Sequence, residues 1–452
     1  MGGKKMILSA RFQIVLQGII PPMLRHLCAA VLICFLIQSN GFTVADDRSE
    51  SAVAAKISFT SSDWPWWRGP YRNGIAAAGQ NPPLEWSASK NVVWKAAIPG
   101  RGHGSPTVVG DQVFLATADE KLQIQSVLCL NRNNGKQIWK TDIHKGGFPK
   151  KGNKKASQAS SSVACDGQRL FINFVHDGAA YTTALSRGGK QLWQTKITDY
   201  VIHQGYGSSP AIYKSVVIVS ADNKGGGAIA ALERLTGDVV WKKERPATPN
   251  YASPIILNAA GREQLVFTGC NLVSSYEPLT GKKLWEIEGS TTECVTSVVT
   301  DGELVFTSGG YPKNHMSAVR ADGSGEIVWE NKTRVYVPSM LVHDGFLYTV
   351  LDAGIVMCWK SDTGQKVWEG RLGGKFTASP ILVGDNIFTT SESGKTFIFK
   401  ATPKAFTLVG DNQLGEEVYA TPTICGNRIY MRVAAQTNGR RQETLFCLGK
   451  RN

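Results

Sequence analysis

Short apolar runs separated by turn residues fill the chain from about residue 92 to residue 449. The runs at 113–117 and 304–307 are rich in β-branched and aromatic residues, and pairs such as Asp301-Gly302 separate one run from the next. Gly, Asp and Asn tolerate the positive φ that tight hairpins require. The pattern therefore predicts an all-β chain built from short antiparallel strands.

A glycine is followed four residues later by a tryptophan six times in this region. The tryptophans are Trp139, Trp193, Trp241, Trp285, Trp329 and Trp368, and they recur at intervals of about 40 to 54 residues. Each period has room for four short strands and none for a helix, which is typical of a propeller blade. A tryptophan in the fourth strand of each period is expected to be buried between neighbouring blades.

Counting the first strands of the periods gives eight units. Each opens with a serine or threonine, often followed by proline, at positions 105, 162, 209, 253, 297, 339, 379 and 421. The last unit, 421–448, has three strands, and Val92–Ile98, with Trp94, looks like a fourth strand without a preceding three. We therefore expect an eight-bladed β-propeller, four antiparallel strands per blade, closed by pairing of the N-terminal strand with the C-terminal blade. Unit seven lacks its tryptophan, and we expect Leu408 or Val409 in its place.

Two segments precede the predicted propeller of residues 92–449. Residues 1–45 resemble a signal peptide, because an 11-residue apolar run at 27–37 is too short to span a bilayer and precedes a small-residue cleavage site. The expected location is periplasmic or secreted, with an uncleaved membrane anchor as the alternative. In the extension 46–91, the stretch 63–74 holds three tryptophans. We expect it to be a strap packed on the propeller rim, the alternative being an exposed aromatic patch.

The net charge of +14 is concentrated in part in one insertion, residues 144–160, which contains Lys145, Lys150, Lys151, Lys154 and Lys155. The simplest interpretation is a solvated flexible loop, and the alternative is a docking site for an acidic partner or an anionic envelope polymer. Only one aromatic residue, Phe148, lies among the lysines, so aromatic and basic residues do not alternate. Nucleic-acid binding is therefore not expected.

Seven cysteines follow residue 45, with no C-x-x-C pair and no adjacent pair. Cys129 and Cys358 each lie ten residues before a tryptophan, where other units have Ala231, Ser275 or Val319. A position that accepts these residues is a small core site, so we expect both thiols to be buried. An odd number of cysteines leaves disulfide pairing open.

Motifs for catalysis or metal binding are missing from the sequence. The histidines after residue 45 form no H-x-H or H-E-x-x-H pair, and no G-x-S-x-G elbow, kinase signature or EF-hand loop occurs. We therefore predict no catalytic residues and no metal ligands.

The mouth of the central channel is the expected binding site of a propeller. The loops that enter the first strands carry His103, His203, Tyr206, Tyr251, Glu293, Tyr336, Phe376 and Tyr419. Such a ring could hold a small planar ligand, a sugar or a peptide. The alternative is that these side chains only plug the channel.

The units at 130–139 and 277–285 resemble pyrroloquinoline-quinone-type (PQQ-like) propeller repeats, and the resemblance covers 92–449. It implies one of two branches. Quinoprotein dehydrogenases bind the quinone with calcium, usually beside a vicinal disulfide, whereas the BamB branch is an eight-bladed scaffold without a cofactor. The strap before the ring also resembles that of secreted propellers of planctomycete bacteria.

The prediction from sequence is an exported, monomeric, non-catalytic propeller that binds an envelope protein or peptide and serves as a scaffold. It needs no cofactor in this interpretation. The alternatives are a PQQ-dependent dehydrogenase-like enzyme, which would require the quinone and calcium, and a carbohydrate-binding or sensor propeller.

Overall fold

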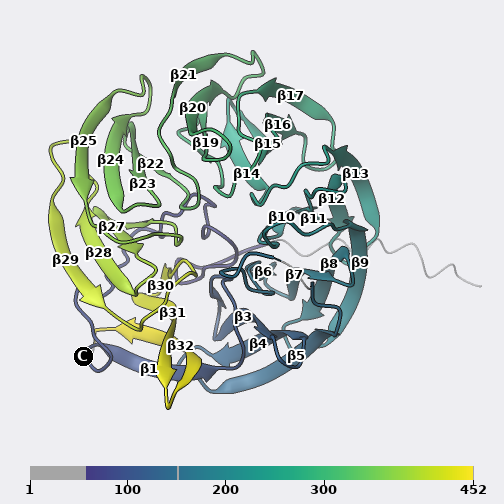
Figure 1. The fold of residues 1–452 in the computed structure, drawn as a ribbon, viewed down its shortest axis with the longest axis vertical. Helices are drawn as coiled ribbons and strands as arrows, with labels where there is room; N and C mark the ends of the chain where they lie inside the picture. The colour runs from purple at the N-terminus through teal and green to yellow at the C-terminus, as the bar shows by residue number, and fades with distance from the viewer. Residues whose placement is uncertain (1–56, 150–151, 451–452) are drawn as a thin grey trace, which may run out of the picture. The chain divides into compact units, whose positions relative to one another are not determined.

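The computed structural model describes residues 57–149 and 152–450. Their 32 strands form eight four-stranded antiparallel sheets arranged around a central axis, and the described residues contain no helix (Figure 1). The predicted eight-bladed β-propeller is confirmed. The predicted signal peptide, residues 1–45, lies outside the described residues.

In the first four blades the strands follow chain order within each sheet. Blade one consists of β2 (Thr107–Val109), β3 (Gln112–Asp119), β4 (Ile124–Asn131) and β5 (Gln137–Lys145). Blade two consists of β6 (Ala164–Cys165), β7 (Arg169–His176), β8 (Ala179–Ser186) and β9 (Gln191–Asp199). Blade three consists of β10 (Ala211–Tyr213), β11 (Val216–Ser220), β12 (Gly227–Glu233) and β13 (Val239–Arg245). Blade four consists of β14 (Ile255–Ala259), β15 (Arg262–Gly269), β16 (Leu272–Tyr276) and β17 (Lys283–Glu288).

The next three blades repeat this order, and the eighth does not. Blade five consists of β18 (Val299–Thr300), β19 (Leu304–Gly309), β20 (His315–Arg320) and β21 (Ile327–Asn331). Blade six consists of β22 (Leu341–His343), β23 (Phe346–Val350), β24 (Ile355–Lys360) and β25 (Lys366–Arg371). Blade seven consists of β26 (Ile381–Val383), β27 (Asn386–Thr390), β28 (Lys395–Lys400) and β29 (Leu408–Gln413). Blade eight consists of β30 (Thr423–Cys425), β31 (Arg428–Thr437), β32 (Arg440–Gly449) and β1 (Val92–Ile98).

The N-terminal strand closes the ring as predicted. β1 pairs antiparallel with β32, with Trp94 opposite Cys447 and Ile98 opposite Glu443. The Trp94 ring lies 6.1 Å from the ring of Tyr430, and its Nε1 donates to the carbonyl of Arg132 in blade one at 2.8 Å. Blade eight therefore joins the two ends of the ring and leaves β32 without an exposed edge.

The glycine and the tryptophan of the repeat meet across blades. Gly189 has a φ of +88°, and a Cβ there would lie 2.7 Å from the ring of Trp139 in the preceding blade. Gly135 also has a positive φ, of +72°, and a Cβ there would lie 2.5 Å from the ring of Trp94. Only glycine combines this backbone conformation with such a close approach. Because β1 is not preceded by a hairpin, blade eight offers no glycine to a tryptophan from blade seven.

The prediction that Leu408 or Val409 holds the tryptophan position of blade seven is wrong. Gly410 pairs with Ile398 there, as Trp368 pairs with Cys358 in blade six. Leu408 and Val409 precede that position and are 46% and 39% exposed. The prediction failed because glycine has no side chain, so the apolar residues beside Gly410 looked like the better candidates.

Trp86 of the N-terminal extension packs against blade seven, which lacks a tryptophan of its own. Its ring is 4% exposed and stacks on Phe388 with centroids 6.4 Å apart. Phe388 holds the position at which Phe306 meets Trp329 in blade five, at 6.0 Å. The Trp86 amide donates to Oδ1 of Asn412 at 2.7 Å, which fixes the extension on β29. A tryptophan from outside the repeats therefore completes the seventh blade.

Side-chain hydroxyls link the blades at the channel. In six junctions the amide of one unit's opening residue donates to the hydroxyl of the next unit's opening residue, at 2.9 to 3.0 Å. The donor–acceptor pairs are Ser105–Ser162, Ser162–Ser209, Ser209–Ser253, Ser297–Ser339, Ser339–Ser379 and Ser379–Thr421. These amides would otherwise be buried without a partner. The repeat therefore requires a hydroxyl at this position, beyond the small size that the sequence pattern suggests.

The tryptophan-rich strap crosses one end of the channel, so its expected position on the rim is wrong (Figure 1). Its backbone pairs with blade one through Trp64 and Val108, and with blade seven through Ile75 and Leu382. Trp64 and Trp66 are buried, which also contradicts the exposed aromatic patch. The ends of the inner strands offer unpaired backbone groups, and the strap satisfies them.

Arg68 anchors the middle of the strap. Its guanidinium is buried and donates to the carbonyls of Pro380 at 3.1 Å, Asn73 at 2.8 Å and Met340 at 2.5 Å. Burial lowers the pKa of Arg68 to about 9. Three carbonyl acceptors compensate the guanidinium for its lost hydration, so this residue ties blades six and seven to the strap.

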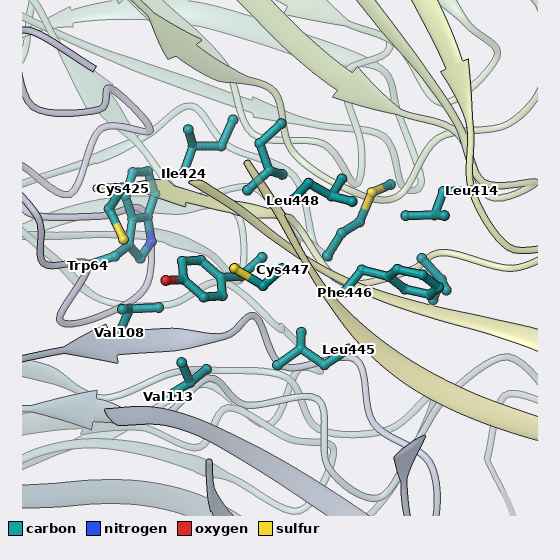
Figure 2. Packing of buried hydrophobic residues seen from close by; sticks show 14 of the residues in the cluster. Trp64, Val108, Val113, Leu414, Ile424, Cys425, Leu445, Phe446, Cys447 and Leu448 are labelled. Carbon is teal, nitrogen blue, oxygen red and sulfur yellow. The ribbon is translucent and has the colours of Figure 1, made fainter. Parts of the chain in front are cut away.

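The cysteines pack as apolar residues. Cys129 and Cys358 are buried as predicted, and all seven cysteines of the described chain are buried and free. Figure 2 shows two of them, Cys425 and Cys447, in the cluster that Trp64 of the strap shares with blade eight. Burial raises the pKa of Cys129 to about 12, so its thiol is protonated at neutral pH.

Candidate functional site

The central channel contains a cavity of about 670 Å³. Loops that enter the inner strands form its walls, and Trp67 of the strap closes it from the opposite end of the channel. The Trp67 indole is fixed by a hydrogen bond from Nε1 to Oγ of Ser297 at 2.8 Å. The channel is therefore a pocket with one mouth, of the size that small ligands or a few peptide side chains fill.

Six of the eight residues predicted at the mouth line this cavity: His103, Tyr206, Tyr251, Tyr336, Phe376 and Tyr419. His203 and Glu293 do not line it. Nε2 of His203 lies 3.2 Å from Oε1 of Glu293, and Glu293 also accepts a hydrogen bond from the Tyr336 hydroxyl at 3.3 Å. Glu293 therefore positions Tyr336, which lines the cavity, although neither His203 nor Glu293 lines it.

The aromatic residues of the wall differ in how much surface they offer. Phe376 is buried in the core of blades six and seven, and the Tyr206 hydroxyl donates to the carbonyl of Ser220 at 2.8 Å. Tyr251, Tyr336 and Tyr419 stay partly exposed. Burial raises the pKa of both Tyr251 and Tyr336, so their hydroxyls remain neutral donors. The three tyrosines are the main aromatic surface at the mouth.

Charged residues that the sequence analysis missed also line the cavity. Arg334 and Asp352 come from blade six, Lys375 from the loop before β26, and Glu392 from blade seven. Burial raises the pKa of Asp352, whose Oδ2 accepts the amide of Tyr336 at 3.1 Å. None of these residues belongs to a recognisable motif, and only the repeat register places their turns at the channel.

The insertion between blades one and two is held at the mouth where the structure describes it, whereas we expected a solvated flexible loop. Nζ of Lys155 pairs with Oε2 of Glu392 at 2.7 Å, and the amide of Asn153 donates to the carbonyl of Gln204 at 2.9 Å. Lys145 and Lys154 are exposed. Lys150 and Lys151 lie outside the described residues.

His103 forms one side of the mouth and is neutral. Its ring packs against that of Tyr419 with centroids 4.6 Å apart and the planes tilted by 34°. Burial, together with the charges of Arg101, Arg432 and Arg441, lowers the pKa of His103 well below its usual value. This imidazole therefore offers aromatic surface without charge.

A second neutral histidine predicts how stability depends on pH. Burial and the stacked ring of His176 lower the pKa of His144 to about 4. His144 donates from Nδ1 to Gln125 and accepts from Gln194 at Nε2, an arrangement that suits the neutral ring. Its unfolded pKa is about 6.5, so between about pH 6.5 and 4 the unfolded chain binds a proton that the folded chain does not.

The free energy of unfolding should therefore fall as pH falls through this window, and His144 should account for about 2 kcal/mol of the fall between pH 7.5 and pH 5. Urea denaturation at pH 7.5 and pH 5 measures it, and His144→Gln should flatten the dependence. His343→Gln, at a ring about one-third exposed, is the matched control and should not. An unchanged slope in the His144 variant would contradict the assignment.

The described residues contain neither a cluster of metal-ligating side chains nor a membrane-spanning helix. No group of three or more His, Cys, Asp or Glu side chains converges in residues 57–149 and 152–450. In the same residues, no helix is long and apolar enough to cross a membrane.

Residues 123–370 match the sequence profile of the family described as outer membrane protein assembly factor BamB. This match spans more than half of the chain. The chain belongs to the BamB family. The match confirms the resemblance to PQQ-like propeller proteins that the repeat units indicate.

Individual relatives are distant. The outer membrane protein assembly factor BamB of Burkholderia pseudomallei is 24% identical over 358 residues, which are 75% of this chain and 84% of that protein. The crystal structure of BamB from Moraxella catarrhalis superposes with a TM-score of 0.56 at 15% identity, covering 78% of this chain and 96% of that one. Quinohemoprotein alcohol dehydrogenase from Comamonas testosteroni superposes with a TM-score of 0.64 at 14% identity, covering 89% of this chain and 82% of that one. At these identities the structures show a shared fold only.

The residues of the cavity do not fit a bound quinone with calcium. Calcium takes six to eight oxygen ligands. The two carboxylates on the cavity wall are engaged, Asp352 by the Tyr336 amide and Glu392 by Lys155. The resemblance to quinoproteins also implies a vicinal disulfide, whereas the cysteines of the described chain are separate, buried and free.

Proposed function

We propose that this chain is a non-catalytic scaffold of the cell envelope, which binds another protein at the channel mouth and assists outer membrane protein assembly. The observation that carries the proposal is the one-mouthed cavity walled by Tyr251, Tyr336 and Tyr419 in a member of the BamB family. Tyrosine is enriched at protein–protein hot spots, because it combines a large apolar ring with a hydrogen-bonding tip.

The proposal includes a periplasmic location, which the BamB relatives favour. It also includes independence from any cofactor. The partner is expected to insert side chains into the cavity, because pockets that exclude water concentrate binding energy.

Replacing Tyr251, Tyr336 and Tyr419 together by alanine should leave the propeller folded and weaken capture of its envelope partner by roughly tenfold or more. Quantitative pull-down from extracts of the native envelope measures the capture, and the melting temperature checks the fold. Tyr71→Ala with Leu122→Ala is the control, since both side chains are exposed and neither lines the cavity. Unchanged capture by a folded triple variant would contradict the proposal.

The dehydrogenase alternative predicts a different result. If the cavity held pyrroloquinoline quinone with calcium, binding at 100 times the dissociation constant would stabilise the protein by about 2.7 kcal/mol, which a thermal shift detects. We expect no shift and no oxidation of alcohols. A dye-linked oxidation that requires the quinone and disappears when calcium is chelated would replace the scaffold proposal.

A further inference from the structure

We propose that the cavity receives an acidic peptide segment, whose carboxylate groups pair with Arg334 and Lys375. This inference rests on the proposed protein-binding function and specifies the chemistry of the partner. The two cations come from the entrance loops of neighbouring blades, six and seven, and both line the cavity.

The cations of the cavity differ in how they are paired. Lys155 is neutralised by Glu392 at 2.7 Å. Arg334 and Lys375 have no carboxylate within ion-pair distance in the part of the chain that the structure describes. Two cations on a wall of a partly enclosed pocket favour a ligand that brings the missing negative charge.

Arg334 is already positioned for such a ligand. Its Nη1 donates to the carbonyl of Gly310 at 2.7 Å, and its guanidinium lies over the ring of Tyr336, 4.9 Å from the centroid. These contacts fix the plane of the guanidinium and leave other N–H groups for an acceptor. A fixed guanidinium plane suits a bidentate carboxylate, because little side-chain freedom is lost on binding.

The remaining chemistry of the cavity favours a peptide with aromatic residues beside its acids. Asp352 also lines this cavity and interacts with the charge of Arg334, and one carboxylate offsets only one of the two cations. Tyr336, Tyr419 and Trp67 give aromatic surface on which rings of a ligand can pack. The exposed Lys154 beside the mouth adds positive charge that attracts an acidic segment from solution.

Fluorescence anisotropy with two labelled hexapeptides tests the inference. One alternates tyrosine with aspartate, and the other has asparagine in place of each aspartate. The acidic peptide should bind the full-length protein more tightly, and Arg334→Gln with Lys375→Gln should weaken its binding by roughly tenfold or more. Lys136→Gln with Lys282→Gln is the control pair. Both residues are exposed, and they lie in the turns between the third and fourth strands of blades one and four, away from the loops that line the cavity.

The outcomes separate this inference from the proposed function. Equal binding of both peptides, lost in the triple tyrosine variant, would overturn the acidic preference and leave the protein-binding function standing. Failure of the acidic peptide to bind would also overturn it, whatever the envelope pull-down shows. Displacement of the acidic peptide by an oligogalacturonate at lower concentration would assign the pocket to an anionic glycan instead. Loss of envelope capture is judged separately, with the tyrosine variants.

Discussion

Deletion of residues 1–98 should abolish cooperative folding of the propeller, whereas deletion of residues 1–56 should leave its melting temperature unchanged. The longer deletion removes β1, which exposes the edge of β32 and empties the site of Trp94 against Gly135. Replacing one buried tryptophan by alanine costs about 3–5 kcal/mol, and a whole domain is stable by only about 5–15 kcal/mol. Loss of the strand and the strap together is therefore expected to exceed the stability of the ring.

A third deletion, of residues 1–91, separates the strap from the strand. It keeps β1 and should give a folded ring of lower stability. Differential scanning calorimetry on the three chains measures the effect. Equal melting temperatures for the deletions of 1–56 and 1–98 would show that β1 does not close the ring.

Trp86→Ala should lower the free energy of unfolding by about 3–5 kcal/mol, although this residue lies outside all eight repeats. Its indole is buried and stacks on Phe388, in the one blade that lacks a repeat tryptophan. Urea denaturation measures the change. Leu84→Ala is the control, since Leu84 belongs to the same segment and is 39% exposed.

A second substitution shows whether Trp86 stands in for the missing tryptophan. In the Trp86→Ala background, Gly410→Trp should restore part of the lost stability, because a Cβ at Gly410 would meet no atom within 4 Å. A further loss of stability in the double variant would indicate that the two positions are not equivalent.

The repeated parts of the fold could be predicted because the same contacts recur at most of the junctions between blades. Five of the six Gly-x-x-x-Trp turns place the glycine against the preceding blade's tryptophan, and six of the eight opening hydroxyls accept from a neighbouring amide. These contacts leave a periodic trace in the sequence. The closure by Val92–Ile98 followed from the same period, since one strand was missing at one end and one was left over at the other.

The parts that occur once could not be predicted. Trp86 meets Phe388 and Arg68 meets Pro380 across some 300 residues, and no local pattern encodes such a pair. The missing tryptophan of blade seven was assigned to apolar neighbours because a glycine gives no sign of what fills the space beside it. The strap was expected on the rim because no local sequence pattern shows that it pairs with Val108 and Leu382.

At the channel mouth, the blade register brought six of eight expected residues to the cavity. His203 and Glu293 do not line it, because their side chains contact each other at 3.2 Å. Arg334 and Lys375 were missed because neither belongs to a motif, and only their lack of a carboxylate partner in the described chain marks them.

Photocrosslinking at the channel mouth tests the central claim most directly. Benzoylphenylalanine in place of Tyr419, which lines the cavity, should crosslink to a specific envelope protein when the full-length chain is expressed in its native host. The same probe in place of Tyr71, which is 61% exposed and does not line the cavity, should not. A crosslinked protein seen only from the mouth is the result that the scaffold account predicts. No protein crosslink from the mouth, or the same crosslink from both positions, would contradict it.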